Sequence, residues 1–156
     1  MKVTRIERSA MVLHSADMMF DLVNDIESYP QYMDGCQGAT VLVRTEQEIV
    51  ARLDLAKAGI KQSFTTRNTL TRPDEIQLRL EEGPFKRLQG HWRFEALTES
   101  ACKVSLILEF EFKSGIAHLA GSKLFSRVAN NLVAATTERA DVIARRTHTS
   151  NEQSTK

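Results

Sequence analysis

Apolar and polar residues alternate over most of the segment from Thr40 to Lys113, and this period of two predicts β-strands. The clearest run is Val104–Phe112, and similar runs lie at Ile49–Leu55 and Ile76–Leu80. Such alternation is typical of antiparallel strands with one dry and one solvated face. Turn residues separate the runs, so the pattern predicts a meander of about six strands after a first strand at Val3–Leu13.

Two segments carry a helical period instead. Apolar residues at helical spacing follow Ser15, a residue type that caps helices, and predict a short helix over Ala16–Ile26. A second amphipathic helix is expected to begin at Gly115 and to run for about 30 residues, roughly 45 Å. The polar segment 146–156 lacks apolar anchors, and we expect it to be disordered.

This order of elements predicts an α+β fold in one domain, residues 1–145. A long antiparallel sheet curves as it twists, so its dry face becomes concave and can wrap around the C-terminal helix. One helix does not fill such a concave face completely. We therefore expect an apolar cavity between the sheet and the helix.

Composition agrees with an ordinary globular domain. The chain has 156 residues, of which 42% are hydrophobic and 26% are charged, and its net charge is +1. Cys36 and Cys102 match no metal-ligand spacing and are expected to be free, buried thiols. The N-terminal residues have no continuous apolar run that would form a signal peptide, so we expect a cytoplasmic protein.

No candidate active site emerges from the sequence. The four histidines have no zinc-binding spacing, and neither a glycine-rich phosphate loop nor a GxSxG motif is present. Glu109 and Glu111 alternate with inward phenylalanines and are expected in solvent. We therefore predict a non-enzymatic protein with no catalytic residue, no metal site and no required cofactor.

The inward positions of strands and helix are the candidate ligand site. They carry mainly aliphatic and aromatic side chains, and the pattern fits both a packed core and the wall of a ligand cavity. Polar inward positions are limited to Gln62, Thr66 and Asn68 on one strand. The predicted cavity residues are Phe64, Leu78, Leu80, Trp92, Phe94, Leu106, Leu108, Phe110, Leu124, Val128 and Leu132.

Basic residues in or beside the turns form a second candidate site. They are Lys57, Lys61, Arg67, Lys86 and Arg87. Such charges commonly serve solubility. If they gather on one rim, they can contact the phosphates of RNA or the lipid headgroups of a membrane surface.

Several stretches resemble the coenzyme-Q-binding, START-like family of the helix-grip (polyketide cyclase/dehydrase) superfamily. They are Val23–Pro30, Gly83–Lys86 with Trp92–Phe94, Phe110–Phe112 and Glu138–Ala140. Lys57–Ile60, Phe64–Asn68 and Gly35-Cys36 are more similar to a bacterial branch named for ribosome-association toxins.

The resemblance implies a helix-grip fold with a curved sheet of about seven strands around the long C-terminal helix. It also implies a binding protein for ubiquinone or another polyprenyl quinone that supports respiratory electron transfer. For the toxin-named branch it implies binding to the large ribosomal subunit, which hinders subunit association. A third alternative, cyclase or dehydratase chemistry as in distant relatives, requires acid–base groups that the inward positions do not supply.

Overall fold

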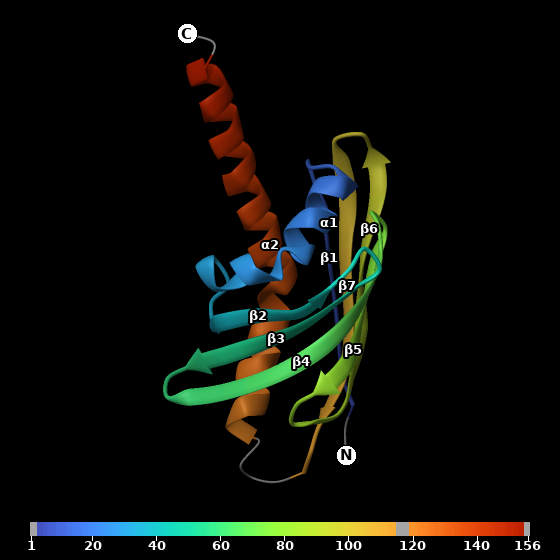
Figure 1. The fold of residues 1–156 in the computed structure, drawn as a ribbon, viewed down its shortest axis with the longest axis vertical. Coiled ribbons are helices and arrows are strands. Elements are labelled where there is room, and N and C mark those ends of the chain that lie inside the picture. The colour runs from blue at the N-terminus through green and yellow to red at the C-terminus, as the bar shows by residue number, and fades with distance from the viewer. Residues whose placement is uncertain (1–2, 115–118, 155–156) are drawn as a thin grey trace.

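Seven strands, two α-helices and one 3-10 helix make up the described residues, 3–114 and 119–154, of this computed structural model (Figure 1). The strands are β1 (Thr4–Val12), β2 (Cys36–Arg44), β3 (Glu48–Lys57), β4 (Ile60–Thr71), β5 (Glu75–Glu82), β6 (Phe85–Thr98) and β7 (Ala101–Phe112). The helices are α1 (Ala16–Asn24), the 3-10 helix η1 (Ile26–Gln31) and α2 (Leu119–Ser154).

The strands form one antiparallel sheet in the order β1-β7-β6-β5-β4-β3-β2, in which only β1 joins out of chain order. The sheet curves around α2, and α1 and η1 lie on the same concave side (Figure 1). The predicted α+β helix-grip architecture is therefore confirmed, including the sequential meander of six strands from β2 to β7.

A row of paired residues crosses the concave face and shows how the sheet bends. It runs from Ile49 on β3 through Asn68, Leu78 and Gly90 to Leu108 on β7. A Cβ atom on Gly90 would stand 2.3 Å from the Ile107 carbonyl oxygen and 2.9 Å from the Leu108 side chain. Glycine at this position therefore permits a close approach between β6 and β7 that any larger residue would prevent.

The core consists of two clusters under α2. One surrounds Phe125, whose ring lies 4.7 Å from that of Phe110 and 5.3 Å from that of Phe64. The other lies beneath α1, where Phe20 and Phe94 meet edge to face at 5.8 Å. Aromatic rings in these geometries contribute stabilisation beyond the apolar area that they bury.

The helices differ from the prediction at their ends. Ser15 caps α1 as expected, because its Oγ accepts the Met18 N–H at 3.1 Å, but the helix ends at Asn24 and gives way to η1. The disordered tail predicted from residue 146 is wrong up to Ser154, because α2 continues as a helix beyond the sheet (Figure 1). Extending an existing helix costs far less than nucleating one, and no proline interrupts this segment. The predicted first residue of this helix, Gly115, and residues 155–156 lie outside the described residues.

Candidate functional site

An apolar cavity lies between the concave face of the sheet and α2. Strands β3 to β7 form its floor, four residues of α2 form its roof, and Ile26 and Tyr29 of η1 close one end. Its volume is about 70 Å³. A water molecule occupies roughly 30 Å³ in the liquid, and a typical ligand pocket has about 300 Å³ or more. The cavity in this conformation is therefore far smaller than a ligand pocket.

A pair of polar side chains from β4 interrupts the apolar lining. Thr66 Oγ1 donates a hydrogen bond to Asn68 Oδ1 at 2.8 Å, and Asn68 is only 5% exposed. Among the described residues, the Asn68 amide Nδ2 makes no hydrogen bond to another side chain. The cavity therefore holds a hydrogen-bond donor that a carbonyl or hydroxyl group of a ligand can satisfy.

Six of the predicted cavity residues line this space: Phe64, Leu78, Trp92, Leu108, Val128 and Leu132. The other five belong to the surrounding core. Phe94 and Leu106 pack in the cluster beneath α1, whereas Leu80, Phe110 and Leu124 pack around the Phe125 cluster. All eleven lie on the dry side, as the alternation predicts, but only some of them reach the cavity.

Sequence reasoning did not select nine further lining residues. They are Ile26, Tyr29, Ala51, Leu53, Thr66, Asn68, Leu88, Phe125 and Ala129. The alternation of β3 and β4 already places Ala51, Leu53, Thr66 and Asn68 inward, so that pattern was a usable signal. Tyr29 gives no such signal, because it reaches the cavity from η1, which follows a helix end.

The cavity offers no group suited to acid–base chemistry near neutral pH. Tyr29 is the single ionisable residue among the described residues that line it. Burial raises the pKa of the Tyr29 hydroxyl well above its usual range, and this hydroxyl donates a hydrogen bond to the Val23 carbonyl. A protonated tyrosine already bonded to the backbone is a poor general base.

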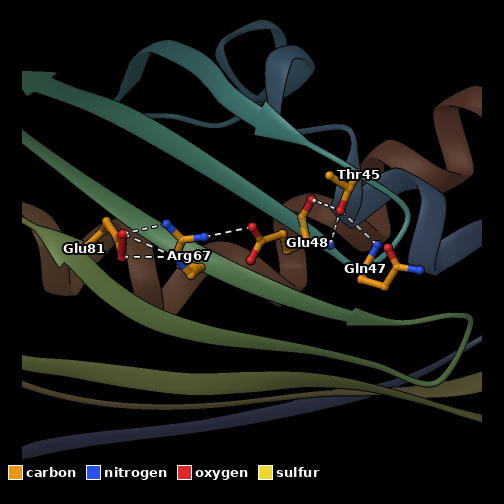
Figure 2. Close-up of polar contacts among 5 residues, drawn as sticks. All are labelled: Thr45, Gln47, Glu48, Arg67 and Glu81. Atoms are coloured by element: carbon orange, nitrogen blue, oxygen red, sulfur yellow. Dashed lines mark hydrogen bonds and ion pairs between the residues drawn. The ribbon is translucent and has the colours of Figure 1, made fainter.

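Convex-face charges are arranged differently, as ion pairs. Figure 2 shows Arg67 between Glu48 and Glu81, with a guanidinium nitrogen 2.8 Å from a carboxylate oxygen on each side. The same view shows Thr45 Oγ1 accepting the N–H groups of Gln47 and Glu48 at 3.2 and 3.0 Å, which orders the β2–β3 turn. The hydrogen bonds from Arg67 lower the pKa of Glu81 and keep it ionised.

The five predicted basic contact residues come from three places in the sheet. Lys57 and Lys61 lie at the β3–β4 turn, Arg67 lies within β4, and Lys86 and Arg87 lie at the start of β6. Arg67 is neutralised by two carboxylates, and Arg87 Nε lies 3.8 Å from Glu111. Lys57 pairs with Asp34. Three of the five predicted positions are therefore already close to carboxylates.

The described residues contain neither a metal-ligating cluster nor a membrane-spanning helix. No cluster of three or more histidine, cysteine, aspartate or glutamate side chains suited to a metal ion is found within them. Within the same part of the chain, no helix is long and apolar enough to cross a membrane.

A family profile described as polyketide cyclase / dehydrase and lipid transport matches residues 12–137. The chain belongs to this family. The match spans the six strands β2 to β7 and α2 up to Thr137, and so covers every element that encloses the cavity.

Relatives in sequence include proteins named ribosome association toxins and a coenzyme Q-binding protein. The chain is 48% identical over 136 residues to the ribosome association toxin RatA of Vibrio cholerae, covering 87% of this chain and 94% of that protein. It is 44% identical to the RatA protein of Escherichia coli K12, over 87% of this chain and 86% of the relative. A more distant relative is the mitochondrial coenzyme Q-binding protein coq10 of Schizosaccharomyces pombe, at 21% over 80% of this chain and 79% of that protein.

Solved structures agree on the fold. The Zhui aromatase/cyclase from Streptomyces sp. R1128 superposes with a TM-score of 0.74 at 21% identity, over 90% of this chain and 94% of that one. A START superfamily protein from Mycobacterium smegmatis gives a TM-score of 0.73 at 21% identity, over 89% of this chain and 98% of that one. At this level of identity the likeness concerns the fold and leaves the chemistry open.

Proposed function

We propose that this protein associates with the ribosome, at its large subunit, and acts without catalysing a reaction. The observation that carries the proposal is the 44–48% identity, over nearly the whole chain, to proteins named ribosome association toxins. We rank the respiratory role second, because the identity to the coenzyme Q-binding relative is only 21%. A ribosomal partner also fits the expected cytoplasmic location.

Co-sedimentation tests this proposal. Purified protein is mixed with large subunits, small subunits or intact ribosomes at low salt and is separated on a sucrose gradient. We expect it to migrate with large subunits and to reduce the yield of joined ribosomes. Free protein at the top of every gradient would contradict the proposal.

The cavity supports a second proposal, the binding of an apolar ligand with a hydrogen-bonding head, such as a prenylquinone. Its walls are almost wholly apolar, and the Asn68 amide supplies one donor in a position to meet a quinone carbonyl. A cavity of about 70 Å³ is too small for such a ring, so binding requires α2 to move away from the sheet. The ligand would then replace contacts that α2 makes with strand residues.

Extraction of freshly purified protein with organic solvent, followed by mass spectrometry, should recover a prenylquinone. Added ubiquinone should raise the melting temperature, because a ligand that binds only the folded state stabilises it. Asn68→Leu should weaken binding about tenfold, the effect of losing one hydrogen bond. The convex-face variant Gln77→Leu is the matched control. A protein that is always empty and does not respond to quinone would contradict this second proposal.

A further inference from the structure

A groove runs between the β3–β4 hairpin and the first turns of α2, outside the cavity. Its floor is small and apolar, formed by Ala58, Ile60 and Leu124, and its volume is about 340 Å³. Three basic side chains border it, one from the hairpin and two from the helix: Lys57, Lys123 and Arg127. A smaller hollow on the other side of the hairpin shares Lys57 and Ile60 and adds Lys61.

Among the described residues, most of the groove cations are unpaired, whereas several arginines of the convex face form ion pairs. On the convex face, Arg5, Arg67 and Arg93 each lie within 3.9 Å of a carboxylate. Lys61, Lys123 and Arg127 are exposed and have no ion-pair partner within the part of the chain that the structure describes.

Carboxylates are nearly absent from the groove itself. No acidic residue lines it among the described residues. Asp34, which does not line the groove, binds Lys57, and its pKa is lowered by Lys57 first and by the charge of Arg127 as well. The groove therefore presents exposed cations with no carboxylate among its described lining residues.

We propose that this groove binds backbone phosphates of RNA in the large ribosomal subunit. The proposal rests on the ribosomal function above and names the surface that carries it. Lysine and arginine side chains around a neutral floor can meet successive phosphates without competition from carboxylates. The helix presents Lys123 and Arg127 one turn apart on the same face, which suits contacts to one strand. Sequence reasoning selected Lys57 and Lys61 but not their partners on α2.

The test compares a groove variant with a matched control. Lys123→Gln with Arg127→Gln removes two charges from the groove and leaves apolar stems of similar length. Arg79→Gln with Lys103→Gln removes two exposed charges from the convex face. Equal far-ultraviolet spectra and melting temperatures establish that both variants fold.

Binding is measured to purified large subunits and to a 16-base-pair RNA duplex over a range of potassium chloride concentrations. We expect the groove variant to bind about tenfold more weakly at 100 mM salt, with a salt dependence reduced by roughly 1.5 in log–log slope for two lost phosphate contacts. The control should stay within about twofold of the parent protein, because general electrostatics alone changes little at these distances.

The outcomes separate the two proposals. If the groove variant binds large subunits as tightly as the parent protein does, the ribosomal function stands and the assignment of the groove is overturned. If the parent protein binds neither large subunits nor the RNA duplex, the assignment of the groove and the ribosomal function are both overturned. Equal weakening by the control, or loss of binding to anionic phosphatidylserine vesicles with RNA binding unchanged, would also overturn the assignment to RNA.

Discussion

The concave and convex faces of the sheet are formed by the same strands but carry opposite kinds of side chain. Inward residues such as Phe64 and Trp92 are buried and apolar, and they leave a small void under α2. Outward residues such as Arg67 and Glu81 are paired with each other across strands. The comparison teaches that stability is concentrated on the dry face, whereas many charges of the wet face form ion pairs near solvent.

The largest expected effect comes from the dry face. Phe125→Ala removes the ring that contacts Phe64, Phe85 and Phe110, and should lower the free energy of unfolding by about 3–5 kcal/mol. Chemical denaturation measures the loss. A loss below about 1 kcal/mol would mean that this part of the interior is loosely packed.

Alkaline pH should lower the free energy of unfolding, and buried groups should contribute more to this loss than surface groups. Burial raises the pKa of the Cys36 thiol from 9.0 to about 11. Below pH 9 both states keep the proton, but between these values the unfolded chain loses it first, so stability falls as pH rises. From pH 8 to 10.5 the thiol should account for a loss of about 2 kcal/mol, at about 1.4 kcal/mol per pKa unit.

The matched experiment for this effect is Cys36→Ala in reducing buffer. The variant should lose less stability over the same pH interval, although Tyr29, whose pKa is also raised by burial, still contributes at high pH. Identical pH dependence in the variant and the parent protein would show that Cys36 titrates normally.

A convex-face ion pair should matter less than either of these. Arg67→Met leaves Glu48 and Glu81 without their partner, yet the Arg67 side chain is 30% exposed and water can solvate the carboxylates. We expect a cost of about 1 kcal/mol, reduced further in 1 M salt. A cost of about 3 kcal/mol, the value for a buried pair, would remove the contrast between the two faces.

The smallest effect on stability should come from filling the void. Ala129→Leu places three more carbon atoms beside a cavity of about 70 Å³. The gain in burial and the crowding of neighbours oppose each other, so the stability should change by less than about 1 kcal/mol. The melting-temperature response to ubiquinone should disappear. Severe destabilisation would show that no usable space exists there.

The sequence predicts the sheet well because alternation is a direct image of a two-sided strand. The inward phase of β7, for example, follows from Val104–Phe112 alone. It predicts the cavity less well, because the same phase does not distinguish Leu106, which packs in the core, from Leu108, which lines the void. That difference depends on where α2 crosses the sheet, which no local pattern encodes.

Charge was the hardest feature to interpret from sequence. In the sequence, Arg67 and Lys61 are indistinguishable, because both are basic residues on the same predicted strand. In the structure Glu48 and Glu81 neutralise Arg67, whereas Lys61 lines the smaller hollow beside the β3–β4 hairpin. The two carboxylate partners of Arg67 lie 14 and 19 positions away in the sequence, and strand register brings them beside it. The α2 residues of the basic groove are brought to the β3–β4 hairpin by tertiary packing.

Leu124 and Val128 lie one turn apart on α2, the first in the floor of the basic groove and the second in the wall of the cavity. The same stretch of helix therefore borders both of the proposed sites. Any ligand that enters the cavity by displacing this stretch also changes the spacing between the α2 cations and the β3–β4 hairpin. If cavity occupancy changes the affinity of the groove for its partner by some factor, occupancy of the groove must change the affinity of the cavity for its ligand by the same factor. The two proposed sites would then be allosterically coupled through α2.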